Sequence, residues 1–347
     1  MELFAQLTRL SCSSAFCHAL DPVNPADTPL LLIAWRRPHA LRQVIDAIRP
    51  VAPTRLYVAC DGPSTERSGE TEKVAATRQV IDQEIDWPCQ IERRYSDENQ
   101  GCHHGETRAM NWFFEQVEEG IILEDDCVPH PDFFPYCATL LERYRYDTRV
   151  WCISGDNFQN GRWRGEGSYY FSRYNHCWGW ASWRRCWQLH DPTLSRWPLL
   201  RDSGLLEAIF EDPLERRYWA GIWQRLVDEG QPDTWDYQWT FTCLAHGGLT
   251  ALPNRNLVRN VGFDSDAVHT RSAEAQPGSA LHFVIQSTSA LPGLPGPLRH
   301  PSFVLRHVAA DRFEFEHKLG GLDLRRQRRL HRRLINGLRR RLPRFGV

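Results

Sequence analysis

Apolar and polar residues alternate in blocks from Thr28 onward. Five apolar or alternating runs predict β-strands, at residues 28–35, 54–60, 89–95, 120–126 and 150–154. Helices are predicted between them, at residues 38–48, 70–85, 102–118 and 132–146. Strands that alternate with helices form a largely parallel sheet with helical crossovers. We therefore predict a doubly wound α/β fold, which binds ligands at the carboxyl ends of its strands.

The character of the chain changes after Gly155. Eleven of the fourteen tryptophans lie between Trp151 and Trp239, where we expect a second lobe that faces the substrate. In the run from Trp178 to Trp187 flat rings could stack on a sugar, but we expect most of them to be core residues and at most one or two to face a ligand. Pro, Gly and Ser are frequent in residues 276–301, which indicates an ordered loop or linker. The expected divisions are an N-terminal extension (1–27), a first α/β half (28–155), a second lobe (156–275), a C-terminal extension (276–324) and a basic tail (325–347).

Composition narrows the class of protein. With 41% hydrophobic and 24% charged residues, and no run of 18 apolar residues, the sequence predicts a soluble globular protein and not a membrane-spanning one. The eleven cysteines include no CxxC pair, which argues against a disulfide framework and favours a reducing compartment. The first twenty residues, with an acidic Glu2 and interspersed polar residues, do not fit a secretory signal. We therefore expect a cytoplasmic protein.

Three consecutive acids, Glu124, Asp125 and Asp126, end the strand at residues 120–126. Carboxylates crowded at the carboxyl end of a strand repel one another unless a cation lies among them. A hard divalent metal that also bridges a diphosphate would satisfy them. The alternative, a solvated turn that caps a helix, needs no ligand.

Three motifs surround these acids in the order EDDCVPHPDFFPYC, WCISGDNFQNG and HCWGWASW. In this order they resemble motifs of the GT-A glycosyltransferases, particularly N-acetylglucosaminyltransferase I and bacterial family-2-like enzymes, over about residues 28–270. The resemblance implies a GT-A-like fold, with a nucleotide-sugar-binding half at residues 28–155 and an acceptor lobe at 156–275. It also implies a nucleotide-diphosphate sugar donor, such as UDP-GlcNAc, and Mn²⁺ or Mg²⁺ held chiefly by Asp126, with Glu124 and Asp125 at the donor.

Further site residues follow from the same resemblance. Arg36 or Arg37 stands where the family's first strand ends in an arginine that contacts the nucleotide, and an exposed arginine at a helix start is the alternative. Asp61 matches the acid that accepts the uracil imide N–H, although an Asp-Gly-Pro turn can form without a ligand. The chain departs from its bacterial relatives at His103 and His104, where they tend to carry Arg or Lys, so a diphosphate contact from this helix is in doubt.

The second lobe supplies a candidate base in the segment DTWDYQW, which contains Asp233 and Asp236. An inverting transfer needs a base for the proton of the acceptor hydroxyl, and Asp236, between two aromatic residues, is the preferred candidate. Its alternative role is to cap the helix that follows. The segment 256–270 resembles one that ends in a histidine near the nucleotide phosphates, which makes His269 a candidate metal or diphosphate ligand.

These residues predict an inverting, metal-dependent glycosyltransferase that acts on a glycan or lipid-linked acceptor. A nucleotidyltransferase would need a Gly-rich phosphate loop with a lysine near the first strand, and the segment AWRRPHA has neither feature. A hydrolase with paired carboxylates requires two acids that face each other, which sequence cannot show. A carbohydrate-binding or scaffolding module on an inactive GT-A fold is the non-enzymatic alternative.

The C-terminal tail carries a separate signal. Ten arginines and no acids lie from Arg325 onward, so the preceding body has a net charge of −11, from 32 basic and 43 acidic residues. Leu330, Leu334, Leu338 and Leu342 recur every four residues and predict one apolar helix face. Such a helix can bind an anionic membrane surface and hold the protein beside a membrane-borne acceptor. The acidic body disfavours nucleic acid as a partner, and a solvated or docked basic helix is the alternative.

Overall fold

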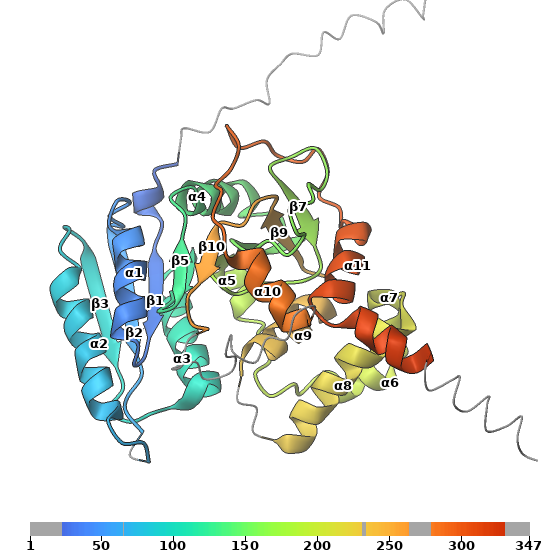
Figure 1. Ribbon diagram of the computed structural model, residues 1–347, viewed down its shortest axis with the longest axis horizontal. Coiled ribbons are helices and arrows are strands. Elements are labelled where there is room, and N and C mark those ends of the chain that lie inside the picture. Colours follow the sequence, from blue (N-terminus) through green and yellow to red (C-terminus); the bar gives the residue numbers. More distant parts are fainter. Residues whose placement is uncertain (1–22, 65, 231–233, 264–278, 330–347) are drawn as a thin grey trace, which may run out of the picture.

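The computed structural model describes residues 23–64, 66–230, 234–263 and 279–329 of the 347-residue chain (Figure 1). Eight strands form one sheet, in the order β3-β2-β1-β4-β8-β6-β9-β7. Six of them run in the same direction, and β7 and β8 are antiparallel to their neighbours. This architecture confirms the predicted α/β fold with a mostly parallel sheet.

The elements agree closely with the sequence prediction in the first half of the chain. The strands are β1 (Leu30–Ala34), β2 (Arg55–Cys60), β3 (Gln90–Tyr95), β4 (Glu119–Glu124), β5 (Cys127–Pro129), β6 (Val150–Ser154), β7 (Tyr169–Ser172), β8 (Trp180–Trp183), β9 (Leu249–Pro253) and β10 (Val258–Asn260). The helices are α1 (Pro38–Ile48), α2 (Glu70–Glu84), α3 (Gly101–Gln116), α4 (Phe133–Tyr144), α5 (Arg184–Trp187), α6 (Trp197–Asp202), α7 (Leu206–Ile209), α8 (Pro213–Glu229), α9 (Asp236–Ala245), α10 (Ala280–Thr288) and α11 (Val308–His317). A short 3₁₀ helix, η1 (Pro25–Asp27), precedes them.

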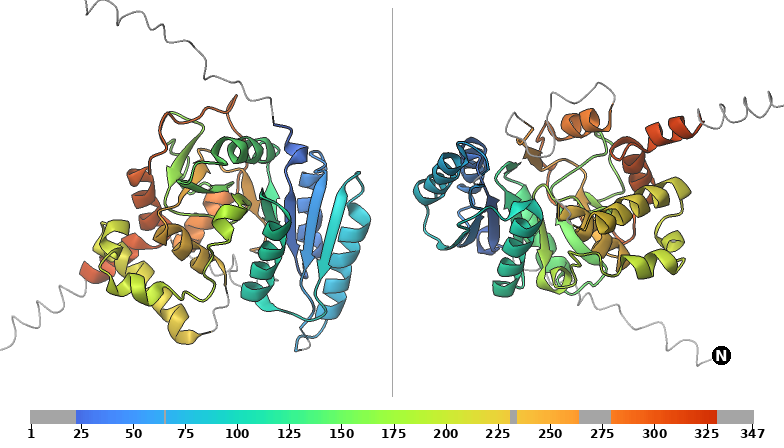
Figure 2. Two further views of the ribbon diagram at one scale, coloured as in Figure 1. Left: turned by 180° about the vertical axis from the view of Figure 1, so that it is seen from behind. Right: turned by 90° about the horizontal axis from the view of Figure 1, so that it is seen from below.

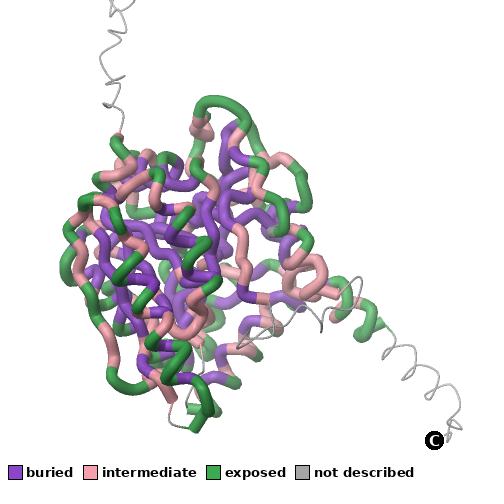
Figure 3. The backbone as a smooth tube through the Cα atoms, turned by 60° about the vertical axis from the view of Figure 1, so that its left-hand side comes forward, coloured by how far each residue is buried: buried purple, intermediate pink, exposed green. Residues whose placement is uncertain are grey.

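The order of strands places a topological reversal between β1 and β4. The chain runs outward from β1 through β2 to β3, and then returns to the other side of β1 as β4. At such a reversal the connecting helices leave toward opposite faces, and α/β sheets bind ligands beyond the strand ends there. β1 and the centre of β4 are apolar and buried because they lie in the middle of the sheet, whereas Glu119 and Glu124 end β4. Figure 3 shows that buried backbone fills the interior of the molecule and that exposed segments lie around it.

The second lobe has a core of its own, which α6, α7, α8 and α9 enclose around the rings of Trp197, Trp219, Trp223 and Phe241. Three of the four tryptophans from Trp178 to Trp187 are buried, which confirms that most of this run is core. Trp178 is half-buried, so part of its ring remains available.

The C-terminal segment packs against the outer strand β7 (Figures 1 and 2). The backbone N–H of His307 donates to the carbonyl of Phe171 at 2.7 Å, and Ser172 Oγ donates to Asp311 Oδ1 at 2.6 Å. The expectation of only loop or linker at residues 276–301 is wrong, because α10 lies within it and the side chain of Ser279 caps the helix by accepting from the backbone of His282. Within the described ranges, no helix is both long enough and apolar enough to cross a membrane.

Candidate active site

The predicted acids lie at the reversal between β1 and β4. Glu124 is the last residue of β4, and Asp125 and Asp126 form the turn into β5. The backbone N–H of Trp35, just after β1, donates to Asp125 Oδ2 at 2.9 Å. Asp125 and Asp126 are each only 7% exposed. The acids are therefore held in the fold and do not form a solvated turn.

Of the two candidate arginines, Arg37 faces the acids and Arg36 does not. Arg37 Nη1 forms an ion pair with Asp126 and lies 3.6 Å from Asp125 Oδ1. Burial alone would lower the pKa of Arg37, but the charges of Asp125 and Asp126 raise it above its ordinary value. Arg36 instead lies over the ring of Trp35 and pairs with Glu70 at 2.8 Å.

Glu106 on α3 is a site residue that the sequence analysis missed. Its carboxyl accepts from Cys102 Sγ at 3.3 Å, while its Oε2 is buried and has no hydrogen-bond partner among the described residues. Burial raises the pKa of Glu106 to about 8, with further contributions from the charges of Asp126 and Asp236. An available signal was its position three residues after His103 and four before Met110, on the buried face of α3.

The acids together carry more negative charge than the neighbouring arginine can balance. Burial raises the pKa of Asp125 to about 7, although Arg37 opposes the shift. Burial, followed by the charges of Glu106 and Asp126, raises the pKa of Glu124 well above its ordinary value. Shifts of this kind mark a place where a bound cation would stabilise the carboxylates.

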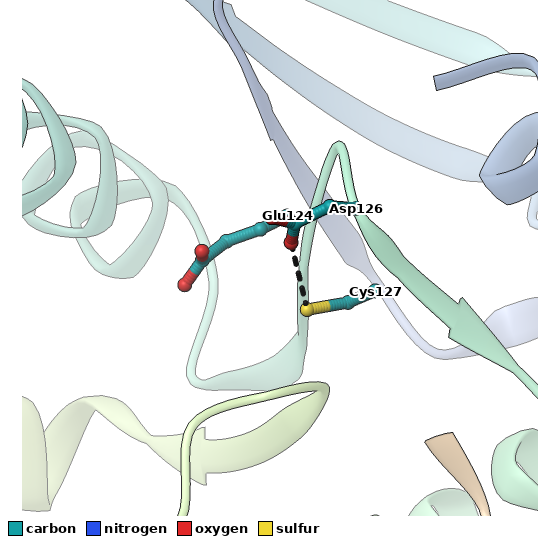
Figure 4. Close-up of side chains that lie close together, drawn as sticks. All are labelled: Glu124, Asp126 and Cys127. Carbon is teal, nitrogen blue, oxygen red and sulfur yellow. Dashed lines mark hydrogen bonds between the residues drawn. The ribbon is translucent and has the colours of Figure 1, made fainter. Parts of the chain in front are cut away.

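Three side chains offer donor atoms that converge at this place (Figure 4). One atom each from Glu124, Asp126 and Cys127 lie within 4.8 Å of one another. Cys127 Sγ donates to Asp126 Oδ1 at 3.4 Å. This donor set fits a divalent cation, and the charge of Glu106 acts on Glu124 beside it.

β10 and the segment that follows it lie beside Asp126. β10 pairs with β5, and Asn260 Nδ2 lies 3.4 Å from Asp126 Oδ1. A Cβ at Gly262 would overlap Asp126 Oδ2 and lie 2.8 Å from Arg37 Nη1, so an added methyl group would force these side chains to shift. His269 lies outside the described residues, which end here at Phe263.

Asp236 acts electrostatically on Glu106 from the start of α9. It is the first residue of α9, whose N-cap is Trp235, so the alternative that Asp236 caps this helix is wrong. Thr234 Oγ1 donates to Asp236 Oδ1, and the charge of Asp236 contributes to the raised pKa values of Glu106 and Cys102. Asp236 therefore faces the α3 side of the acidic cluster. Asp233 lies outside the described residues.

His103 has a structural contact instead of an open position. Its Nδ1 donates to the carbonyl of Thr234 at 3.0 Å, and Gln238 Nε2 donates to the same carbonyl at 2.7 Å. These bonds join α3 to the turn before Asp236. His104 is exposed.

Asp61, at the end of β2, holds a loop in place. Its carboxylate accepts from the backbone N–H of Gly62 at 2.9 Å, from that of Gln100 at 3.0 Å and from Asn99 Nδ2 at 3.0 Å. These bonds join the end of β2 to the start of α3. A nucleobase that bound to Asp61 would therefore share a carboxylate that already accepts hydrogen bonds from the protein.

Asp156, two residues after β6, is a further buried acid that sequence reasoning missed. It is 1% exposed, accepts from the backbone of Trp178 at 3.2 Å, and its Oδ1 lacks a partner in the described part of the chain. Burial raises the pKa of Asp156 well above its ordinary value, although Lys318 opposes the shift. The motif SGDNF, at a strand's carboxyl end, was the signal available in the sequence.

Comparison with known proteins adds little beyond the fold. No protein-family model matches the sequence, and no curated protein matches it. Among solved structures, it is similar to the mannosyltransferase PcManGT from Pyrobaculum calidifontis in complex with GDP-Man and Mn²⁺, with 13% identity, a TM-score of 0.34, and coverage of 65% of this chain and 72% of that one. It is also similar to 4-diphosphocytidyl-2C-methyl-D-erythritol synthase from Anaerococcus prevotii, with 7% identity, a TM-score of 0.32, and coverage of 76% and 97%. Likenesses at this level transfer no activity to the chain.

Proposed function

We propose that the protein is an inverting, metal-dependent glycosyltransferase that moves a sugar from a nucleotide-diphosphate donor to a glycan or lipid-linked acceptor. The observation that supports this most directly is the group of acids at the β1–β4 reversal, where the pKa values of Glu124 and Asp125 are raised although arginines lie nearby. A UDP-sugar, such as UDP-GlcNAc, is the proposed donor because of the resemblance of the EDD, WCIS and HCWGW motifs.

The donor diphosphate would lie beyond the ends of β1 and β4. Asp126, with Glu124 and Asp125 beside it, would hold Mn²⁺ or Mg²⁺, which when bound neutralises the departing nucleoside diphosphate. Arg37, already among these acids, would turn its guanidinium to the diphosphate oxygens. Arg36 would stabilise the segment after β1 through its contacts with Trp35 and Glu70.

Asp236 would act as the base. Its place at the first turn of α9 is held by the bonds that His103 and Gln238 make to Thr234. From there its carboxylate would take the proton of the acceptor hydroxyl as that oxygen attacks the anomeric carbon from the side opposite the leaving group. The product would then have the inverted anomeric configuration.

Two predicted contacts concern the nucleotide and stay predictions. Asp61 would accept the imide N–H of uracil while it keeps the Asn99–Gly101 turn in place. His269 would reach the phosphates or the metal, since the described chain leaves Gly262 directly beside Asp126.

The division into a donor half (28–155), an acceptor lobe (156–275) and two C-terminal parts (276–324 and 325–347) belongs to the same proposal. We place the protein in the cytoplasm, with the basic tail on the inner face of the membrane. Arg326, Arg328 and Arg329 are exposed, as this requires, whereas Arg325 pairs with Asp212 on the body.

The test is a screen of sugar nucleotides for thermal stabilisation, with and without Mn²⁺. We expect one donor to raise the melting temperature only when the metal is present, and Asp126→Asn to abolish the shift. Asp46→Asn, at an exposed position on α1, is the matched control and should behave like the wild type. Transfer at the full rate in excess EDTA would contradict the proposal, and metal-dependent donor binding without turnover on any acceptor would favour the inactive binding module.

A further inference from the structure

We propose that Cys127 makes the cation site selective for thiophilic metals, so that Zn²⁺ or Cd²⁺ binds there through a thiolate and displaces Mn²⁺. The observation is the convergence of donor atoms from Cys127, Glu124 and Asp126 within 4.8 Å (Figure 4). The displacement of Mn²⁺ rests on the proposed function, whereas the binding of Zn²⁺ or Cd²⁺ does not.

The side chain of Cys127 points into the acids. Its Sγ donates to Asp126 Oδ1 at 3.4 Å, and the residue has 0% exposure, so no water competes for this contact. When a metal binds, the thiol proton leaves to solvent and one S–metal bond forms. The same step removes the hydrogen bond from the thiol to Asp126 Oδ1, which leaves this oxygen with only the long contact from Asn260 Nδ2 at 3.4 Å.

A second buried acceptor lies near the same cysteine. Asp156 Oδ1 is buried and unpartnered among the described residues, and the charge of Asp156 acts on the thiols of both Cys127 and Cys177. The charge of Glu124 acts on the same two thiols.

The choice of metal follows from the donor set. Mn²⁺ prefers oxygen ligands and lies at the weak end of the affinity series of divalent metals, whereas Zn²⁺ binds more tightly and accepts sulfur. A carboxylate site for Mn²⁺ that also offers one thiol should therefore bind Zn²⁺ more tightly. Zinc would act as a competitive inhibitor at the site where manganese supports transfer.

Cadmium provides a readout that does not depend on activity, because a Cd–thiolate bond gives an ultraviolet charge-transfer band. Titration of the metal-free, full-length protein with Cd²⁺ should produce this band with one equivalent. Cys127→Ser replaces the thiol donor to Asp126 by a hydroxyl donor and should remove the band. Cys89 is a half-buried cysteine before β3, and Cys89→Ser should retain the band. A band that persists in Cys127→Ser overturns the proposal.

Manganese competition separates this inference from the proposed function. Zn²⁺ should release bound Mn²⁺, detected as the paramagnetic resonance signal of free Mn²⁺, and Cys127→Ser should reduce the preference for zinc by at least about tenfold. Mn²⁺ binding without a Cd–thiolate band refutes the inference about Cys127 and leaves the proposed function intact. A Cd–thiolate band without Mn²⁺ binding supports the inference about Cys127 and contradicts the proposed function. If Cys127→Ser fails to fold, X-ray absorption of the wild type with one equivalent of Zn²⁺ decides: a sulfur neighbour at about 2.3 Å supports the proposal, and a shell of oxygen and nitrogen alone overturns it.

Discussion

Replacing Glu106 by glutamine should stabilise the metal-free protein near neutral pH. Burial and the charges of Asp126 and Asp236 raise the pKa of Glu106 to about 8. In the unfolded chain this carboxyl ionises near its ordinary value of 4.5. Folding at pH 7 therefore requires that Glu106 take up a proton or remain charged beside other acids, and either change lowers the free energy of unfolding. Glutamine avoids this loss of stability while it keeps the shape of the side chain.

The size of the effect depends on pH in a defined way. A carboxyl whose pKa is raised on folding costs nothing below its unfolded pKa, and the cost grows as the pH rises toward the folded value. The slope is about 1.4 kcal/mol per pH unit. From pH 4.5 to pH 7 this amounts to about 3 kcal/mol, so Glu106→Gln should gain roughly that much at pH 7 and little at pH 4.5.

Urea unfolding in the presence of chelator, at several pH values from 4.5 to 8, measures this difference. Glu72→Gln, at an exposed position on α2, is the control and should show no comparable trend. Saturating Mn²⁺ should reverse the benefit, because the ion stabilises the charged form of the acid that the variant lacks. The reasoning fails if Glu106→Gln changes stability equally at pH 4.5 and pH 7, or if it destabilises the metal-free protein at pH 7.

Three further predictions address the chemistry, the fit of the site and the membrane. Asp236→Asn should bind the donor normally but lower kcat by about 10² to 10⁴, and an unchanged rate or a retained anomeric configuration would exclude Asp236 as the base. Gly262→Ala should weaken the Mn²⁺ affinity measured by calorimetry, because the new methyl group overlaps Asp126. Gly221→Ala on α8 is the control and should not change the affinity, because a Cβ there meets no atom within 4 Å. Equal Mn²⁺ affinities in the two variants would refute the argument from close approach. The full-length protein should sediment with anionic liposomes at low salt and lose this binding when residues 325–347 are deleted, and no binding at low salt would refute the membrane role of the tail.

The positions of Arg36, Arg37 and Glu106 could not be predicted from the sequence. Arg36 and Arg37 are adjacent and chemically identical, so their sequence could not tell which one reaches the acids. The turn after β1 decides this, because it directs Arg37 to Asp126 and Arg36 to Glu70. Glu106 went unnoticed because an acid on a helix is usually solvated, and only the packing of α3 shows that this residue is half-buried with its Oε2 shielded from solvent.

The local order of apolar and polar residues determined the elements and the fold class by itself. Strand and helix periods are local properties, and strands that alternate with helices lead to a parallel sheet whose carboxyl ends share one edge. The run Glu124–Asp126 could therefore be placed at that edge from sequence alone. The tertiary structure decided which distant groups meet these acids. Glu106 on α3 acts on Glu124, and Asp236 on α9 acts on Glu106. Their approach depends on how each helix packs on the sheet, a nonlocal property that no segment encodes alone.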